Sequence, residues 1–178
     1  MSGDRAAGSL QSQLARWRVP LGFACAALVF ALAQPTWPRL VAGLGVAAVG
    51  EAIRFWAAGH LEKGREVTAS GPYRWVEHPL YIGSGVMGVG VAVASRTAWA
   101  AIVVALYIGL TLAAAIRTEE AALRATFGAT YDSYRSGVFI DRARRFSMTR
   151  ARRNREHRAA FGVAVGFGLL ALKLALTM

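Results

Sequence analysis

The apolar residues of this chain fall into five blocks of 15 to 20 residues, and this pattern constrains the fold more than any other feature. The blocks are residues 19–33, 39–58, 80–95, 98–116 and 160–177. A helix rises about 1.5 Å per residue, so the longer blocks reach across a hydrocarbon core of roughly 30 Å, whereas the shorter ones need flanking residues or a thinner bilayer. Only 17% of the residues are charged and the mean hydropathy is +0.37. We therefore expect an all-α polytopic membrane protein of about five transmembrane helices, folded as a single domain over residues 1–178.

The first block ends in Ala31-Leu32-Ala33, which resembles a signal-peptidase site. We expect a retained span instead, because further hydrophobic blocks follow and Pro35 lies just beyond the putative cut. The third and fourth blocks are joined only by Arg96-Thr97 and should form a tight helical hairpin.

The distribution of Lys and Arg indicates the orientation. Seventeen lie in the N-terminal tail and in segments 59–79 and 117–158, whereas the opposite side holds only Arg39 and Arg96. Cytosolic loops are enriched in Lys and Arg, so we expect a cytosolic N-terminus and a C-terminus on the opposite side, with Lys173 snorkelling toward that surface. Both long polar segments then face the cytosol, where function should be sought.

A net charge of +11 raises nucleic acid as a partner. Eight arginines lie between Arg142 and Arg158, but beside a membrane span such a cluster is typical of binding to anionic headgroups, at about 1 kcal/mol per residue. We therefore expect anionic lipids at 142–158 and no nucleic acid. The single Cys25 excludes an intramolecular disulfide.

The first polar segment places a histidine at the start of a predicted helix. Residues 70–72 form a turn signal, and Pro79 suits the first turn of the third span. His78 should therefore lie at the mouth of that helix, with Tyr81 one turn on. The alternative is an ordinary interfacial loop whose aromatic residues form a belt, namely Tyr73, Trp75 and Tyr81.

The second polar segment begins with two adjacent acids, Glu119 and Glu120. If the fourth helix ended near them, they would lie at the negative end of its dipole, which suggests a cationic partner. Alternatively the helix continues, and Glu120 pairs with Arg124 across one turn. Three aromatic residues then follow at the spacing of one helix face and could be an interfacial anchor or a lid: Phe127, Tyr131 and Tyr134.

Two further features lie within the spans. Glu51 and Arg54 are one turn apart in the second block, where charges are costly and usually functional, although a structural ion pair is the alternative. Residues 83–88 match the dinucleotide pattern G-x-G-x-x-G, but no strand precedes them and no acid follows about 20 residues later. Close helix packing through small residues explains these glycines better.

Taken together, these motifs resemble the isoprenylcysteine carboxyl methyltransferase family, which is related to the membrane phospholipid N-methyltransferases. They are GPY at 71–73, EHPLYIG at 77–83, EEAAL at 119–123 and FGATYDSY at 127–134. The resemblance covers residues 50–138 and leaves out the basic linker 139–158 and the extra span 160–177. It implies cytosolic cofactor-binding loops with short interfacial helices, S-adenosylmethionine as cofactor, and a lipophilic or lipidated substrate that enters from the bilayer.

The resemblance also implies roles for individual residues. Catalysis is assigned to Arg54 and Glu120, and substrate binding to Arg54 and Tyr131. The implied cofactor contacts are Tyr73, His78, Pro79, Tyr81, Gly83, Arg117, Glu119 and Glu120, with no metal. The cofactor carries a sulfonium, an ammonium and a carboxylate, so its pocket needs acids, aromatic faces and one basic donor. Members usually have Arg where this chain has Glu77, and many have Arg at Ala115, for which the nearby Arg117 is the expected substitute.

The acceptor group and the function class have alternatives. A carboxylate acceptor, as in isoprenylcysteine O-methylation, is favoured, because it needs no general base and Arg54 could hold it. Phospholipid-type N-methylation would need a base, either His78 or a glutamate. A nicotinamide-dependent membrane reductase is disfavoured, because Leu80 and Ser84 stand where such enzymes tend to have Asn and Glu. A non-catalytic scaffold that binds anionic lipid through 142–158 is the remaining alternative.

Overall fold

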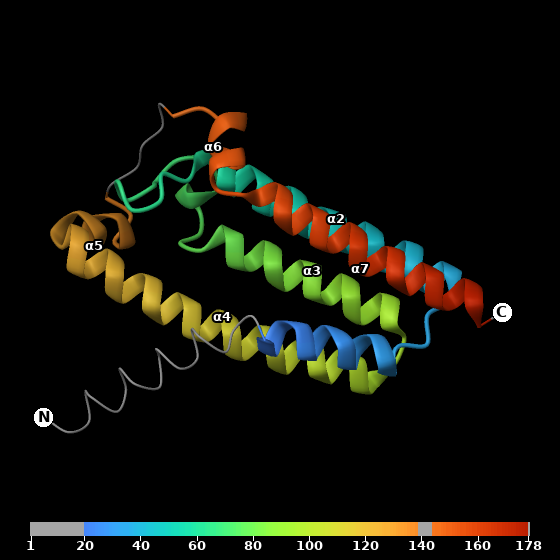
Figure 1. Cartoon of the computed structure of the whole chain (residues 1–178). Coiled ribbons are helices and arrows are strands. Elements are labelled where there is room, and N and C mark those ends of the chain that lie inside the picture. Colours follow the sequence, from blue (N-terminus) through green and yellow to red (C-terminus); the bar gives the residue numbers. More distant parts are fainter. Residues whose placement is uncertain (1–19, 139–143, 178) are drawn as a thin grey trace, which may run out of the picture.

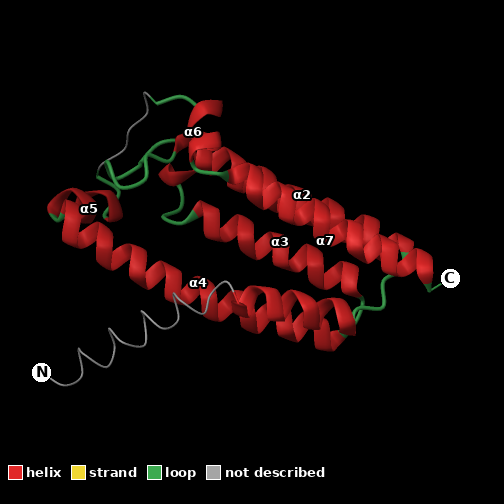
Figure 2. Ribbon diagram, viewed as in Figure 1, coloured by secondary structure: helices red, strands yellow, loops and turns green. Residues whose placement is uncertain are grey.

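The computed structural model describes residues 20–138 and 144–177, and all regular secondary structure in these ranges is helical (Figure 2). An initial helix spans Pro20–Leu32. The other elements, in chain order, are α2 (Trp37–His60), the 3-10 helix η1 (Gly71–Arg74), α3 (Pro79–Ser95), α4 (Ala98–Phe127), α5 (Ala129–Arg135), α6 (Met148–Arg153) and α7 (Glu156–Leu176). The expected all-α polytopic fold is therefore confirmed.

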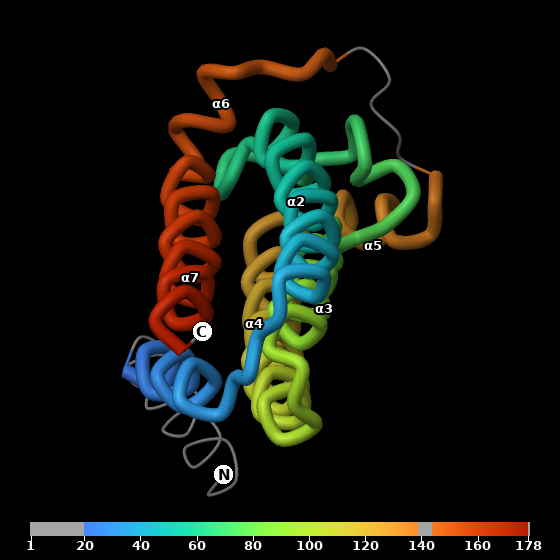
Figure 3. Tube along the Cα trace, turned by 90° about the vertical axis from the view of Figure 1, so that its right-hand side faces the viewer, coloured from blue at the N-terminus to red at the C-terminus, as the bar shows by residue number. Residues whose placement is uncertain are grey.

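Five apolar helices correspond to the five apolar blocks. α2, α4 and α7 are long and apolar enough to cross a membrane, whereas Pro20–Leu32 and α3 are shorter. The long helices run side by side, with α3 between α2 and α4 and with α7 along α2 (Figures 1 and 3). The short elements α5, α6 and η1 gather at one end of the bundle (Figure 1). The two polar segments thus share one end, and its assignment to the cytosol stays a prediction.

α2 and α3 approach closely along a seam of four glycines, spaced seven residues apart on each helix: Gly43, Gly50, Gly83 and Gly90. A Cβ added at Gly50 would lie 2.6 Å from the Gly83 carbonyl oxygen, and one at Gly43 would lie 2.4 Å from that of Gly90. Small residues let helix backbones meet in a bilayer, where no hydrophobic driving force brings helices together. The prediction that the glycines of residues 83–88 serve close helix packing is confirmed for two of them. Gly83 meets α2, and a Cβ at Gly88 would meet Ile108 of α4, whereas Gly85 faces open space.

α7 is joined to the bundle at both of its ends. At its N-terminal end Glu156 pairs with Arg54 of α2. At its C-terminal end the Lys173 ammonium donates to the carbonyls of Phe30 and Ala33, at 2.6 and 2.7 Å, and so caps the initial helix. Cations are favourable at a helix C-terminus, and the snorkelling of Lys173 toward the surface at this end stays a prediction. Apolar residues of α2, α3 and α7 form one buried cluster, which includes Leu40, Ala47, Ala94, Phe167, Leu170 and Leu174.

The basic linker folds back onto the first polar segment. The Asn154 side-chain amide donates to the carbonyls of Ala58 and Leu61, both at 2.9 Å, and this caps the end of α2. Glu62 pairs with Arg150 and Arg153, and Glu66 pairs with Arg144. Arg142 lies outside the described residues. Among the described residues of the linker five arginines are exposed, and Arg153 is the one of them that pairs with Glu62. The other four are the candidates for binding anionic lipid, which stays a prediction: Arg145, Arg152, Arg155 and Arg158.

Candidate functional site

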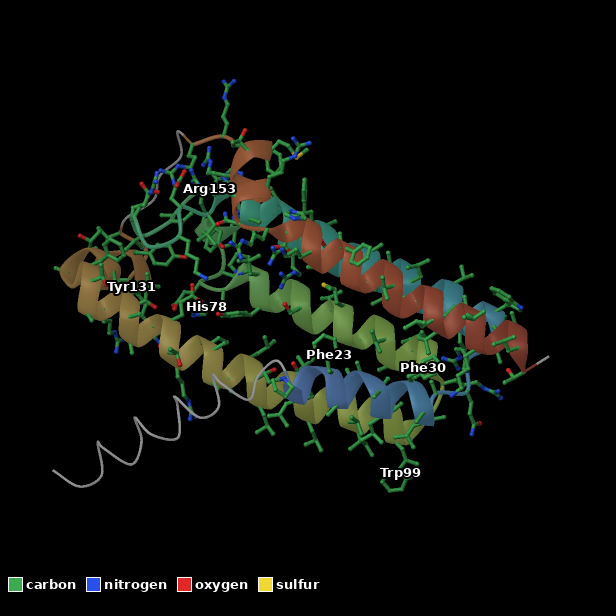
Figure 4. All side chains as sticks on the ribbon, in the orientation of Figure 1. Phe23, Phe30, His78, Trp99, Tyr131 and Arg153 are labelled. Carbon is green, nitrogen blue, oxygen red and sulfur yellow. The ribbon has the colours of Figure 1, made fainter. Side chains whose placement is uncertain are left out.

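His78 and a pair of glutamates from α4 form the centre of the site. His78 is the N-cap residue of α3, held there by Pro79 at the first helical position. Its Nε2 lies 3.4 Å from Glu120 Oε1, and its Nδ1 lies 3.9 Å from Glu119 Oε2. The Tyr81 ring lies 5.6 Å from the imidazole. Figure 4 shows His78 at the start of α3, facing α4.

The acids do not lie at a helix end, because α4 continues to Phe127. Glu119 and Glu120 thus do not lie at the negative end of the α4 dipole, and of the two alternatives the continuing helix is confirmed. The expected pairing of Glu120 with Arg124 is also wrong, since Arg124 pairs with Asp132 at 3.8 Å. The extension carries Glu119 and Glu120 beyond the apolar part of α4, to the level where the chain enters α3.

A guanidinium from α5 completes the cluster. Arg135 Nη1 lies 3.6 Å from Glu120 Oε2, and its Nε lies 3.6 Å from Glu77 Oε1. The substitute expected from the sequence, Arg117, is exposed, and within the described residues no ion pair or hydrogen bond joins it to the cluster. Sequence reasoning missed Arg135, because nothing in its spacing shows that α5 folds back over His78.

Two tyrosines hold α5 against η1. The Tyr134 hydroxyl donates to the Tyr73 carbonyl at 2.8 Å, and Tyr131 is only 1% exposed. The spacing of three aromatic residues had suggested one helix face, but they lie on two helices. Phe127 ends α4, whereas Tyr131 and Tyr134 belong to α5. Gly128 (φ +47°) ends α4 and starts α5 between them, a conformation that L side chains rarely adopt. Tyr131 is therefore an anchor for α5, and its predicted contact with substrate remains untested.

Tyr73 brings a buried hydroxyl toward the acids. It is 8% exposed, and its hydroxyl has no hydrogen-bond partner among the described residues. Burial, and then the nearby Glu119 charge, raise the pKa of Tyr73 well above its usual range. The phenol therefore stays protonated at neutral pH and can donate a hydrogen bond. A buried donor without a partner is costly, so this hydroxyl fits a group that is supplied by a ligand.

Arg54 forms a second polar centre deeper in the bundle. Its Nε binds Glu156 Oε1 at 2.6 Å, and its Nη1 donates to the Ser84 hydroxyl and the Leu80 carbonyl of α3. The expected partner Glu51 is more distant, at 3.8 Å. Both Glu51 carboxylate oxygens are buried and have no hydrogen-bond partner within the described part of the chain. The sequence did not identify Glu156, which lies outside the region of resemblance.

The cluster also has the composition of a metal site. Glu77, His78 and Glu120 offer ligand atoms that lie within 4.8 Å of one another. Carboxylates and imidazole are ordinary ligands of divalent transition metals. However, the Arg135 guanidinium already lies beside both carboxylates and supplies positive charge there. The donor set fits the positive groups of S-adenosylmethionine equally well, with Tyr81 and Tyr73 as aromatic neighbours.

The chain is similar to a known protein family and to a curated bacterial protein. The family model described as phospholipid methyltransferase matches residues 38–130, just over half of the chain. The cobalt-zinc-cadmium resistance protein CzcN of Cupriavidus metallidurans is 35% identical over 123 residues, covering 62% of this chain and 55% of that protein. This chain thus spans about half the length of that curated relative. No solved structure matches.

Proposed function

This chain belongs to the phospholipid methyltransferase family, and from that premise we propose that it transfers a methyl group from S-adenosylmethionine to a lipophilic acceptor that enters from the bilayer. The chain is a multi-pass membrane protein of a methyltransferase family. We infer S-adenosylmethionine as its methyl donor and a lipophilic molecule as its methyl acceptor. The observation that carries the proposal is the convergence of His78, Glu119 and Glu120 at the polar end of the bundle.

The residues of the cluster fit this cofactor by charge and by shape. When bound, S-adenosylmethionine supplies an electrophilic methyl group on a sulfonium. Glu119 and Glu120 would balance its positive groups, and the aromatic faces of His78 and Tyr81 suit a cation of this kind. The unpartnered Tyr73 hydroxyl would donate to an acceptor atom of the ligand. Together these side chains orient the ligand at the mouth of α3.

Arg54 lies on the membrane side of this cluster. It binds the Leu80 carbonyl and the Ser84 hydroxyl, which lie in the first two turns of α3. His78 immediately precedes the same helix. An acceptor headgroup that lies between the two polar centres would be aligned with the methyl group and shielded from bulk water, and both effects accelerate methyl transfer.

The charges around Arg54 support an amine acceptor over a carboxylate. Glu156 already binds the guanidinium at 2.6 Å, and Glu51 adds a second carboxylate nearby. A carboxylate acceptor would have to displace Glu156 and would be repelled by Glu51. An amine would instead be attracted, and Glu51 could accept its proton before attack, because both of its oxygens lack a hydrogen-bond partner among the described residues.

The test is transfer of a radiolabelled methyl group by the purified full chain in nanodiscs. Phosphatidylethanolamine and an S-farnesylated N-acetylcysteine would serve as amine and carboxylate probes. Label in an alkali-stable methylamine product supports the amine, and label in an alkali-labile ester supports the carboxylate. The Glu51→Gln variant should lose transfer to the amine, whereas Glu66→Gln, at a peripheral ion pair, should not. Absence of label with either probe and with total lipid extract would reject the methyltransferase.

A second candidate function is binding of a divalent metal cation at Glu77, His78 and Glu120. The name of the relative CzcN refers to resistance to cobalt, zinc and cadmium. Arg135 counts against this candidate, because its positive charge lies 3.6 Å from two of the three ligand carboxylates, Glu77 and Glu120, and would repel a metal cation there. Calorimetric titration with Zn²⁺ or Co²⁺ in the presence and absence of S-adenosylhomocysteine would test it. Strong heat that Glu77→Gln abolishes would favour the metal.

A further inference from the structure

Arg135 is held at the cluster by two carboxylates that leave its hydrogen-bond donors available. Its distances to Glu77 and Glu120 are both 3.6 Å, which is longer than a hydrogen bond. The side chain is 43% exposed, and ion pairs with that exposure contribute little to stability. The two acids lie beside the guanidinium, and within the described residues none of its five N–H groups makes a hydrogen bond, so these donors can bind another oxyanion.

A ligand that carries a carboxylate needs a positively charged side chain in this cluster, because the cluster is otherwise acidic. Glu77, Glu119 and Glu120 supply three negative charges, and among the described residues Arg135 is the one arginine that pairs with any of them. Two positive groups of S-adenosylmethionine suit these acids, but its carboxylate would be repelled by them. A guanidinium binds a carboxylate through two parallel hydrogen bonds, and this makes arginine the favoured partner.

The position of Arg135 is set by the packing of α5. Arg135 is the last residue of α5 and directly follows Tyr134, whose hydroxyl binds the Tyr73 backbone. The buried Tyr131 anchors the preceding turn. Glu77 directly precedes His78 in the chain, and its carboxylate lies 3.6 Å from the Arg135 guanidinium. The acid at position 77 thus acts as a positioning residue for an arginine that comes from another element.

We propose that Arg135, positioned by Glu77, binds the carboxylate of S-adenosylmethionine. This inference rests on the proposed function and names a cofactor contact that the sequence assigned to Arg117. It accounts for an exposed arginine that lies 3.6 Å from two of the acids and makes no hydrogen bond within the described residues.

The test compares S-adenosylmethionine with its decarboxylated analogue, which keeps the sulfonium and the amine and lacks only the carboxylate. Calorimetry on the purified full chain in detergent should show that the native protein prefers the intact cofactor by about 10- to 100-fold, as expected for hydrogen bonds to a charged group. Arg135→Gln should remove this preference and leave affinity for the analogue within about twofold. Arg135→Lys should retain part of the preference, because it keeps the charge but loses the planar fork.

Arg124→Gln is the matched control, because Arg124 is also exposed and pairs with an acid of α5, Asp132. It should leave the preference intact. If Arg135→Gln keeps the native preference, or if Arg124→Gln removes it equally, the assignment is wrong. Binding of the decarboxylated analogue by each variant shows that its site is folded. Failure of the native protein to bind either ligand would instead reject the proposed function, and the assignment with it.

Discussion

Arg54 of α2 and Glu156 of α7 form a partly buried ion pair of 2.6 Å that connects the second apolar helix to the last one. Glu156 is 4% exposed and lies in the first turn of α7, where a negative charge is favourable for the helix dipole. The guanidinium also binds α3 through Leu80 and Ser84. One arginine therefore joins three helices, and one of them lies outside the region that matches the family.

We expect Glu156→Gln to destabilise the protein by about 2–4 kcal/mol, because loss of one partner leaves a charge in the bundle without compensation. Glu51, at 3.8 Å, should limit the loss by moving toward Arg54. Thermal unfolding in detergent measures the change. Glu66→Gln, which breaks a more exposed pair with Arg144, should cost less than about 1 kcal/mol. Equal effects of the two variants would contradict the role of the Arg54–Glu156 pair.

The glycine seam makes a prediction with a control in the same helix. Gly83→Ala should destabilise the protein by about 1–3 kcal/mol, since its Cβ would lie 2.6 Å from the Gly50 carbonyl and force α2 and α3 apart. Gly85→Ala, two residues on, meets no atom within 4 Å and should be neutral or slightly stabilising. Unfolding temperatures of the two variants compare the effects directly. A neutral Gly83→Ala would show that the helices do not meet there.

Stability should fall at alkaline pH because of Tyr73 and Tyr134. Burial raises the pKa of both phenols, followed by nearby charges, chiefly Glu119 for Tyr73 and Glu77 for Tyr134. The native state therefore retains protons that the unfolded chain loses at about pH 10. This contribution is fully present below pH 10 and is lost as the pH rises toward the native values. The slope of unfolding free energy against pH above 10 should be shallower in Tyr73→Phe.

Tyr134→Phe should cost about 1 kcal/mol at neutral pH, because it removes the hydrogen bond to the Tyr73 carbonyl. Tyr73→Phe should cost less, since its hydroxyl has no partner to lose within the described residues. Chemical unfolding of both variants at pH 7 separates the two cases. A larger loss for Tyr73→Phe would mean that its hydroxyl has a partner in the resting protein.

The exposed arginines of the linker should recruit anionic lipid. Replacing Arg145, Arg152, Arg155 and Arg158 with Gln should reduce the amount of anionic lipid that co-purifies with the protein, as measured by mass spectrometry. Replacing Glu62, which pairs with Arg150 and Arg153, should release those arginines and increase it. If neither variant changes the amount of co-purified anionic lipid, the linker arginines do not recruit it, and their role is confined to the ion pairs within the protein.

The five helices and the contact of His78 with Glu119 and Glu120 could be predicted, for different reasons. Hydropathy marks spans because the bilayer requires long apolar helices. The contact came from family resemblance, since no local pattern joins residues 42 positions apart. Arg135 and Glu156 could not be found in this way. Arg135 reaches its partners because the short helix α5 folds back over His78, and Glu156 reaches Arg54 because the linker folds back to the end of α2. Only the tertiary structure reveals these two contacts.

The predicted helix face of Phe127, Tyr131 and Tyr134 was wrong because periodicity assumes one continuous helix. Gly128 was visible in the sequence, but a single glycine inside a helical pattern is often tolerated. Its positive φ turns the chain and sends Tyr131 into the interior. This turn is also what brings Arg135 to Glu77 and Glu120, so the same residue explains both the error and the missed arginine.

We propose that the polar end of the bundle binds S-adenosylmethionine through His78 and Glu120, and calorimetric titration of the purified chain with S-adenosylhomocysteine measures this binding. We expect saturable binding at one site, a loss of at least about tenfold in Glu120→Ala and His78→Ala, and no change in Glu66→Ala. No binding by the native chain, or native affinity in Glu120→Ala, would contradict the claim.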